Sequence, residues 1–460
     1  MIVELLEFYS FFATATVRML MIVATINFLT IFYLVRRSKH YYLSDKSSEM
    51  RTSSRIGRKV TAIVPVYHET EENIAATIDS ILSQVPTPLE IFAIFDVNDE
   101  VAVKTLERYS GKVRCLVSQK HITKRDAVAW GVRQAQGSLI LNVDSDTVLS
   151  EGCLRRLLES IRDPQVGAVR TSNKISNNQH FAGKYSAAIE RGRHVIDSAL
   201  TPALVVVDGR CGLWRKSAIL PILDQYEHDR FLGKRVIIGE DRQLTRLILA
   251  SGWKTVYNPN AVVTTLAQPT TESLLRQQLR WARSGYLYWF RDIKDGYYSR
   301  FPTPWKIQTT TYFLLPFLLC VAVLYDTMVN PIHIAVFSIV GGAILFNIIT
   351  IPLGLFLWTY YRKEMFGLEI SNEDTLVFGL FGFFVMFPLM LFSAVTMGAQ
   401  GGWLTRGTNG NGIGVHPNYT HFPIARRGLT TWKKAVMVMG VIVALSLFGL
   451  LSFLFIVRAY

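Results

Sequence analysis

One stretch decides the fold: Ser138-Leu139-Ile140-Leu141-Asn142-Val143-Asp144-Ser145-Asp146. Its first six residues form a short, largely apolar run, which is typical of a strand buried in a sheet. Two carboxylates follow directly, at Asp144 and Asp146. Ligands of open α/β sheets bind outside the carboxyl ends of the strands. The stretch therefore predicts a buried strand that carries a binding site at its end.

Three more apolar runs precede this strand, at residues 60–66, 89–95 and 113–117. Helical patterns lie between them, such as the one at 71–84. The alternation of strands and helices predicts an α/β domain with a parallel, doubly wound sheet. Parallel strands bring their carboxyl ends to one edge, so we expect the acidic residues that follow them to share one cleft. These residues are Glu69, Asp96, Asp144 and Asp146.

A basic turn opens the helix between the third and the fourth strand, at Thr123-Lys124-Arg125-Asp126. Alone, such a turn is typical of a solvated surface. Cations and backbone N–H groups at the start of a helix also bind anions well. The spacing of Asp144 and Asp146 suits a hard divalent cation, Mg²⁺ or Mn²⁺, which also takes phosphate oxygens. We therefore expect a diphosphate between the basic turn and the metal site.

A second group of chemically active residues lies in Gly239-Glu240-Asp241-Arg242 and Gln277-Gln278-Leu279-Arg280-Trp281. The two adjacent carboxylates begin a predicted helix, where acidic residues also occur for purely structural reasons. Asp241 is able to accept a proton from a nucleophile. Arg280 suits bidentate binding of a phosphate, and Trp281 suits stacking on a sugar ring. Together these residues indicate base-assisted chemistry on a sugar beside a phosphate.

The composition indicates a membrane protein with a soluble insert. Half of the 460 residues are hydrophobic, and they come in blocks. Residues 376–400 are expected to be re-entrant or interfacial, because Pro388 splits them into two pieces that are too short to span. The expected spans are residues 19–35, 307–325, 332–361 and 435–457. The expected domains are an anchor at 1–37, a linker at 38–58, a catalytic domain with a closing interfacial helix at 59–300, and membrane or interfacial helices at 301–460.

The net charge of +14 is compatible with nucleic acid, anionic lipid or an anionic substrate. No zinc-finger spacing or RNA-binding aromatic signature occurs, so we expect no nucleic-acid partner. Basic pairs such as Arg36-Arg37 and Lys433-Lys434 flank apolar segments, as cytoplasmic flanks do. The chain is therefore expected in the cell membrane as a multi-pass protein with a cytoplasmic catalytic domain. Its four cysteines are widely spaced, which favours reduced thiols.

Four motifs, in this order, resemble those of the processive family 2 glycosyltransferases. They are Asp96, Asp144-Ser145-Asp146, Gly239-Glu240-Asp241 and Gln277-x-x-Arg280-Trp281. Within this family the chain is similar to hyaluronan synthases, nodulation-type chitin-oligosaccharide synthases and the type 3 capsule synthase. The resemblance covers residues 60–290 well. It implies a GT-A-type glycosyltransferase domain inserted between α-helical transmembrane and interfacial segments.

The chain departs from these relatives at two places. Arg210 follows Gly209 where hyaluronan and chitin synthases usually carry Gly-Pro, and this turn looks more like the type 3 capsule synthase. Glu190-Arg191 is followed by Gly192-Arg193-His194 rather than by the Glu-Arg-x-x-Gln-Ser pattern of the family. These departures leave the acceptor sugar open.

The resemblance implies an inverting transfer from a UDP-sugar donor to a growing polysaccharide at the lipid bilayer, with Mg²⁺ or Mn²⁺ as cofactor. Asp241 is implied as the general base and Glu240 as its support, while Asp146 and Asp144 are implied as metal ligands. The implied nucleotide site is Tyr67, Glu69, Asp96, Lys124, Arg125, Asp144, Gln277 and Arg280, with Trp403, Thr405 and Arg406 from a gating loop at 401–417. The implied acceptor site is Trp281, Gly209, Arg210, Cys211 and Arg242.

The product is predicted from cations near the cleft. Arg210, Arg215, Arg242 and Arg283 are able to pair with a glucuronate carboxylate, although phosphate or lipid would also suit them. We therefore expect a hyaluronan synthase that uses UDP-GlcNAc and UDP-GlcA and translocates its polymer. The alternatives are a chitin synthase, which needs UDP-GlcNAc only, and a type 3-like capsule synthase.

Two further classes remain open. A lipid-directed, non-processive glycosyltransferase shares the Asp-x-Asp cleft but does not need the Gln-x-x-Arg-Trp motif. A pure transporter would leave the large soluble domain unexplained.

Overall fold

The structure is a computed structural model, and it describes residues 18–19, 22, 25–26, 29–38, 59–329 and 372–399. These residues belong to two compact units, one of which contains Phe32–Thr309. The other contains the described residues before Phe32 and those from Thr310 onward. The expected spans at 332–361 and 435–457 and the gating loop at 401–417 lie outside the described residues.

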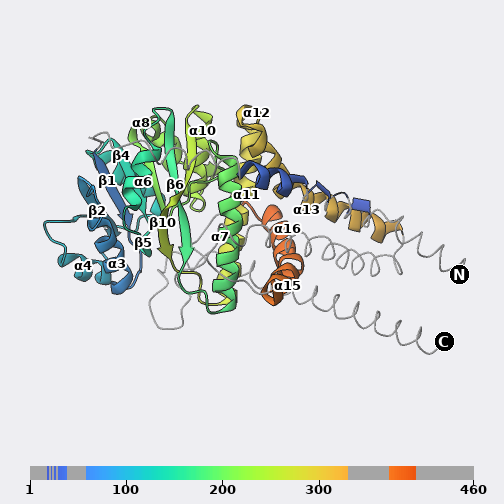
Figure 1. Cartoon of the computed structure of the whole chain (residues 1–460), viewed down its shortest axis with the longest axis horizontal. Coiled ribbons are helices and arrows are strands. Elements are labelled where there is room, and N and C mark those ends of the chain that lie inside the picture. Colours follow the sequence, from blue (N-terminus) through green and yellow to red (C-terminus); the bar gives the residue numbers. More distant parts are fainter. Residues whose placement is uncertain are drawn as a thin grey trace, which may run out of the picture. The chain divides into compact units, whose positions relative to one another are not determined.

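The first unit is built on an eight-stranded sheet in the order β3-β2-β1-β4-β7-β6-β10-β5 (Figure 1). The predicted strands at 60–66, 89–95, 113–117 and 138–143 are confirmed to within one residue at each end. The strands are β1 (Val60–Pro65), β2 (Glu90–Asp96), β3 (Arg114–Ser118), β4 (Leu139–Val143), β5 (Thr147–Leu149), β6 (Val166–Ile175), β7 (Cys211–Arg215) and β10 (Lys254–Thr265). A separate hairpin consists of β8 (Arg230–Phe231) and β9 (Lys234–Arg235).

The sheet is mixed, so the prediction of a parallel sheet is wrong for one half of it. Strands β1 to β4 pair in parallel, but β7 runs antiparallel to both β4 and β6, and β5 runs antiparallel to β10. The apolar run at 205–207 lies before the turn at Gly209 and forms no strand, while β7 follows that turn at Cys211–Arg215. The α/β class is confirmed.

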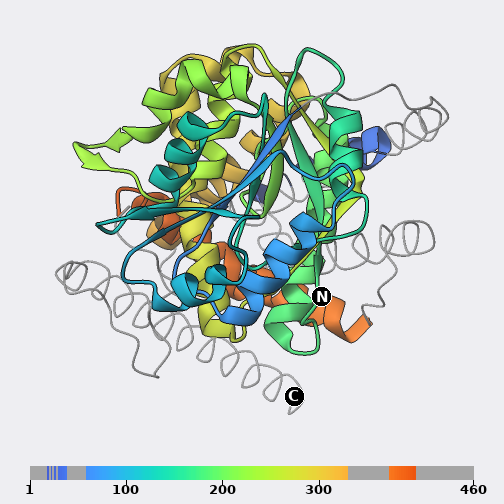
Figure 2. The ribbon, with the colours of Figure 1, turned by 90° about the vertical axis from the view of Figure 1, so that its left-hand side faces the viewer.

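Helices cover both faces of the sheet (Figures 1 and 2). Side chains alternate along β1, so Ala62 and Val64 pack with one core and Ile63 with the other. The first core includes α3 (Glu71–Leu82) and α6 (Cys153–Ser160), and the second includes α5 (Lys124–Gln134), α9 (Leu223–Glu227) and α10 (Glu240–Ala250). The remaining helices of this unit are α4 (Glu100–Glu107), α7 (Phe181–Leu200), α8 (Lys216–Ile219), α11 (Thr271–Lys294) and α12 (Tyr297–Arg300).

Within the described residues, three α-helices extend beyond Thr309 or lie after it. They are α13 (Thr303–Val329), α15 (Asn372–Phe381) and α16 (Phe387–Val395). A π-helical turn at Gly382–Met386 joins α15 to α16, and Pro388 stands in the first turn of α16. The helical path runs on through Pro388 to Val395, and the re-entrant or interfacial placement of 376–400 stays a prediction. None of the helices described, including α13 with the expected span 307–325, is both long and apolar enough to cross a membrane.

Candidate active site

The candidate site is centred on the ammonium group of Lys124, the first residue of α5. Thr123 caps this helix, and the Thr123 and Asp126 side chains bond each other's backbone N–H groups, which fixes where it begins. The Lys124 Nζ atom lies 2.5 Å from Asp144 Oδ1 and 3.2 Å from Glu240 Oε1. Burial lowers the pKa of Lys124, but these carboxylates outweigh it and raise the pKa above its usual value. The lysine therefore stays charged and links β4 to α10.

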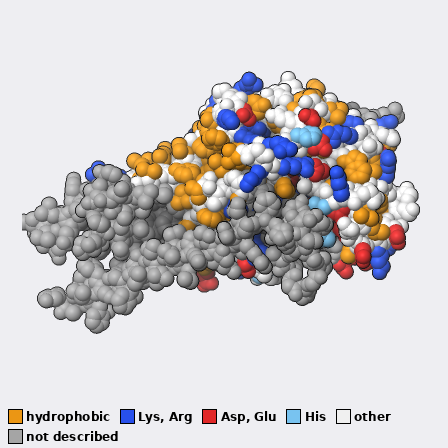
Figure 3. Space-filling model, turned by 180° about the vertical axis from the view of Figure 1, so that it is seen from behind, with side chains coloured by type: hydrophobic (Ala, Val, Ile, Leu, Met, Phe, Trp, Pro, Cys, Tyr) orange, Lys and Arg blue, Asp and Glu red, His pale blue; other side chains and the backbone are white. Residues whose placement is uncertain are grey.

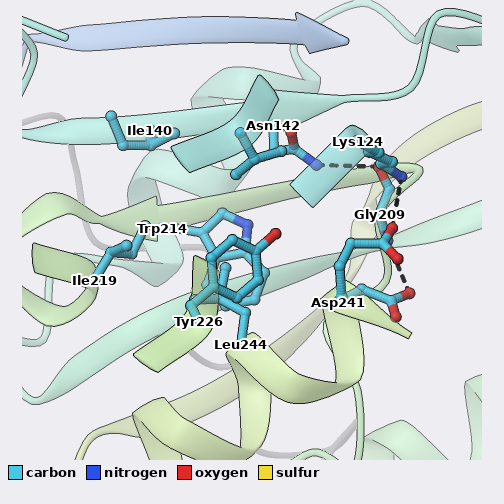
Figure 4. Close-up of a pocket in the computed structure, with 11 residues that line it drawn as sticks. Lys124, Ile140, Asn142, Gly209, Trp214, Ile219, Tyr226, Asp241 and Leu244 are labelled. Carbon is cyan, nitrogen blue, oxygen red and sulfur yellow. Dashed lines mark hydrogen bonds and ion pairs between the residues drawn. The ribbon is translucent and has the colours of Figure 1, made fainter. Parts of the chain in front are cut away.

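Because Gly209 has no side chain, it leaves room for the Lys124 ammonium group. A Cβ atom at Gly209 would lie 2.4 Å from Lys124 Nζ. The Gly209 N–H also donates to Asp241 Oδ2 at 3.3 Å, and its carbonyl accepts from Asn142 Nδ2 at 3.3 Å (Figure 4). The glycine predicted in the acceptor site thus shapes the lysine–carboxylate centre.

Replacing Gly209 by Ala is expected to weaken catalysis without unfolding the chain. The new methyl group would force Lys124 Nζ away from its two carboxylates. A hydrogen bond to a charged group contributes about 1.5–3 kcal/mol, so the catalytic rate should fall roughly tenfold to a hundredfold. The readouts are the transfer rate and the thermal midpoint.

Gly192→Ala is the matched control, because no described atom lies within 4 Å of that added methyl group. Wild-type activity in Gly209→Ala would show that the lysine does not need its present position.

The two adjacent carboxylates at the start of α10 have different environments. Burial raises the pKa of Glu240, but Lys124 and Arg280 outweigh it and lower the pKa below its usual value. The pKa of Asp241 is raised, first by burial and then by the negative charge of Glu240. Asp241 also accepts backbone N–H bonds from Gly209 and from Arg242, the latter at 2.7 Å. Asp241 is therefore the more basic of the two carboxylates and is held in a fixed orientation.

The Asp-Ser-Asp segment follows β4 at the same end of the sheet. Burial, together with the nearby charge of Asp146, raises the pKa of Asp144 to about 6, although Lys124 acts in the opposite direction. Two carboxylates so close to one another favour a cation between them. The described part of the chain holds no cluster of three or more acidic, histidine or cysteine metal ligands. Since Mg²⁺ takes one or two carboxylates plus substrate phosphates, Asp144 and Asp146 fit a cation shared with a diphosphate.

A second polar group lies at the ends of β2 and β3. His121 Nδ1 is 3.1 Å from Asp96 Oδ2, and the Tyr67 ring meets the His121 ring edge-on with centroids 5.0 Å apart. Glu69 accepts a hydrogen bond from Asn73 Nδ2 at 2.8 Å. The structure thus brings Tyr67 and Asp96 together. The sequence interpretation missed His121, although its place just after a strand was a usable signal.

Trp281, on α11, lies against a buried network of charges. The guanidinium groups of Arg193 and Arg210 are 5.5 Å and 5.6 Å from the centre of its ring. Arg210 Nη1 lies 2.6 Å from Glu190 Oε1. Burial raises the pKa of Glu190, but Arg210 and the other arginines outweigh it and lower the pKa below its usual value. The sequence interpretation assigned no role to Glu190. Its partner Arg170 also pairs with Asp197 and Asp208, which therefore belong to the same network.

His194, on α7, contributes a pH-dependent term to the stability of this region. It forms a hydrogen bond with the Tyr257 hydroxyl, and its pKa is lowered to about 4 by burial and by Arg170. An unfolded histidine has a pKa of about 6.5, so only the unfolded chain takes up this proton between pH 6.5 and pH 4. Acidification through that window should therefore lower the free energy of unfolding, by on the order of 1–2 kcal/mol at pH 5.

His194→Gln is expected to lose this pH dependence, measured as thermal midpoints at pH 7 and pH 5. His228→Gln is the control, because His228 is exposed. An unchanged difference between pH 7 and pH 5 in His194→Gln would contradict the assignment.

Three of the predicted site residues point elsewhere. Arg125 is buried, and its guanidinium donates to the Tyr226 carbonyl at 2.6 Å and to the Tyr288 hydroxyl, so in this structure it holds α5 in the core. The Cys211 side chain is fully buried in the opposite core. Arg242 lies close enough to Asp292 to lower the pKa of that carboxyl group.

Gln277 and Arg280 lie on α11 just before Trp281, and Trp403, Thr405 and Arg406 lie outside the described residues.

Comparisons with known proteins identify the family. A family model described as "Glycosyltransferase like family 2" matches residues 57–284. An N-acetylglucosaminyltransferase from Neorhizobium galegae is 30% identical over 372 residues, which cover 77% of this chain and 82% of that protein. The chain belongs to the family 2 glycosyltransferases. This membership agrees with the predicted GT-A-type domain.

Other relatives of this family 2 glycosyltransferase match over a shorter stretch. N-acetylglucosaminyltransferases from Rhizobium sp. (strain N33) and Mesorhizobium japonicum are 33% and 35% identical, over 52% and 49% of this chain. The chain spans about half the length of these two relatives, 55% and 56%. A solved mannosyltransferase from Pyrobaculum calidifontis, in complex with GDP-Man and Mn²⁺, matches at a TM-score of 0.48 and 16% identity over 78% of this chain and 98% of its own.

Proposed function

We propose that this family 2 glycosyltransferase transfers N-acetylglucosamine from UDP-GlcNAc to the end of a growing β-linked chitin-type oligosaccharide. The observation that carries the proposal is the match over 372 residues to a protein named N-acetylglucosaminyltransferase. The site supports it, since one cleft contains a basic carboxylate, a charged lysine and a paired aspartate motif.

The structure removes the main argument for a uronic acid donor, so the alternative chitin interpretation is preferred to hyaluronan synthesis. Arg210 is already paired with Glu190. Arg215 donates to the backbone carbonyls of Val166 and Ile161, at 3.0 Å and 2.9 Å. Two of the cations that had suggested a glucuronate site are therefore engaged within the fold, and the relatives carry the name of a neutral-sugar transferase.

The proposed mechanism uses the charged side chains of this cleft. Asp241 accepts the proton of the acceptor hydroxyl as that oxygen attacks the anomeric carbon of the donor, and the bond from that carbon to the diphosphate breaks. One such displacement inverts an α-linked donor into a β-glycoside. Lys124 keeps its charge and faces the leaving diphosphate, while Glu240 holds the lysine in place. A Mg²⁺ or Mn²⁺ ion held by Asp146 and Asp144 would supply Lewis acidity to the diphosphate.

The proposal includes a membrane setting. The catalytic unit would work at the cytoplasmic face of a cell membrane, add sugars processively and pass the product across. Its support is the pattern of apolar blocks with basic flanks in the sequence, together with the Lys and Arg side chains that are prominent on the described face in Figure 3.

Product formation from single and paired donors tests the proposal. UDP-GlcNAc alone should yield oligosaccharides that a chitinase degrades and a hyaluronidase leaves intact. Adding UDP-GlcA should change neither the yield nor the chitinase sensitivity. A polymer that forms only when UDP-GlcA is present would overturn the chitin proposal in favour of hyaluronan synthesis.

A further inference from the structure

A small pocket lies beside the catalytic carboxylates, between β4, α5 and α10 (Figure 4). Its cavity is about 20 Å³, large enough for one water molecule or a methyl group. Lys124, Gly209 and Asp241 border it on one side. Its apolar lining consists of Val128, Ile140, Trp214, Ile219 and Leu244.

Two polar side chains in this pocket have no role in the mechanism above. Asn142 Oδ1 is buried, and among the described residues no donor reaches it. Its Nδ2 group already donates to the Gly209 carbonyl, which fixes the amide orientation. The Tyr226 hydroxyl points into the space between Asn142 and Asp241 (Figure 4). Burial raises the pKa of Tyr226 above its usual value, so this hydroxyl stays protonated and can donate.

An acetamido group has the complementary chemistry. It offers one N–H donor, one carbonyl acceptor and one methyl group. The cavity of about 20 Å³ has room for the methyl group alone, against the apolar wall at Trp214 and Leu244. The N–H and the carbonyl stay on the side of Lys124 and Asp241, where the N–H suits Asn142 Oδ1 and the carbonyl suits the Tyr226 hydroxyl. A sugar hydroxyl in its place would leave the apolar wall empty and would satisfy fewer of the polar groups.

The position of the pocket indicates that it contacts the donor sugar. The diphosphate side of the cleft is marked by Lys124 and Asp144, and the acceptor side by the base Asp241. The transferred sugar must lie between leaving group and base. The pocket borders both Lys124 and Asp241, so it adjoins that sugar.

We infer that the pocket formed by Asn142, Tyr226 and Trp214 binds the acetamido group of the donor sugar and selects UDP-GlcNAc over UDP-glucose. This inference rests on the proposed function and names the residues that determine donor specificity.

Competition titrations on the purified full chain test the inference, because they report donor binding whether or not turnover occurs. The affinities of UDP-GlcNAc, UDP-glucose and UDP are measured for wild type and Tyr226→Phe. This change removes only the hydroxyl, since Arg125 contacts the backbone carbonyl and the ring of Tyr226, and phenylalanine keeps both. The preference for UDP-GlcNAc over UDP-glucose should fall about tenfold, as expected for one lost hydrogen bond, while UDP affinity stays unchanged.

A second variant and a control separate specificity from folding. Val128→Ile adds one methyl group to the pocket lining and should lower UDP-GlcNAc affinity while UDP-glucose affinity is retained. Tyr109→Phe, whose side chain packs on the opposite core, should keep the wild-type preference.

An unchanged preference in both pocket variants, with wild-type protein that still prefers UDP-GlcNAc, would overturn the inference and leave the proposed function intact. A wild-type protein that does not bind UDP-GlcNAc would overturn both.

Discussion

Asp241→Asn should reduce sugar transfer by roughly a hundredfold or more while UDP affinity stays near that of wild type. The amide has almost the same shape, and its oxygen can still accept the Arg242 N–H, but it cannot take the proton of the acceptor hydroxyl. Because the pKa of Asp241 is raised, wild-type transfer should also decline on acidification at a higher pH than an ordinary aspartate would cause. Initial rates of UDP release and titration with UDP measure the two effects.

Glu240→Gln is the matched variant. The Glu240 carboxylate pairs with Lys124 and has a lowered pKa, so its loss should weaken the placement of the lysine more than proton transfer. We expect a smaller loss of rate than in Asp241→Asn. An active Asp241→Asn enzyme beside an inactive Glu240→Gln enzyme would reverse the two assignments.

The strands and the cleft could be predicted because they depend on local pattern. Apolar runs followed by polar residues place Asp96 and Asp144 at strand ends, and the structure has them there. The antiparallel β7 could not be predicted in this way, because its direction is set by its neighbours β4 and β6. Its own five residues carry no signal that distinguishes a parallel from an antiparallel partner.

The directions of adjacent side chains at the start of a helix could not be predicted from the sequence either. Successive side chains on a helix point about 100° apart, so Lys124 and Arg125 cannot face the same cleft. Lys124 reaches the carboxylates, and Arg125 enters the core. The sequence gives both as cations at the start of a helix and does not say which of them turns inward.

The charge network beside Trp281 depends on ion pairs between residues far apart in the sequence, which sequence patterns do not predict. Glu190 stood out only as a departure from a family motif. In the structure it neutralises Arg210, 20 residues along the chain, and also contacts Arg170 and Arg193. Arg210 was predicted to be a spare cation for a substrate carboxylate. Its partner comes from another element, so only the fold shows that this charge is already matched.

Replacement of Asp146, the proposed metal ligand, is expected to abolish most of the transfer activity. Asp146→Ala leaves the Lys124–Asp144 pair in place, so it tests the cation more cleanly than a change at Asp144 would. Without the ion, the developing charge on the diphosphate loses stabilisation of several kcal/mol, which corresponds to roughly a hundredfold or more in rate. Titration of Mn²⁺ in the presence of UDP should show much weaker binding, and a chelator should inactivate wild type in the same way.

Asp224→Ala is the control, because Asp224 is an exposed aspartate that pairs with His228. It should bind Mn²⁺ and transfer sugar as wild type does. Full turnover by wild type in excess chelator would show that the protein's own cations neutralise the diphosphate. Lys124 would then be the leading candidate, since it is charged, fixed by two carboxylates and placed at the same strand end as Asp144. That outcome would remove the ion from the mechanism and leave the role of Asp241 unchanged.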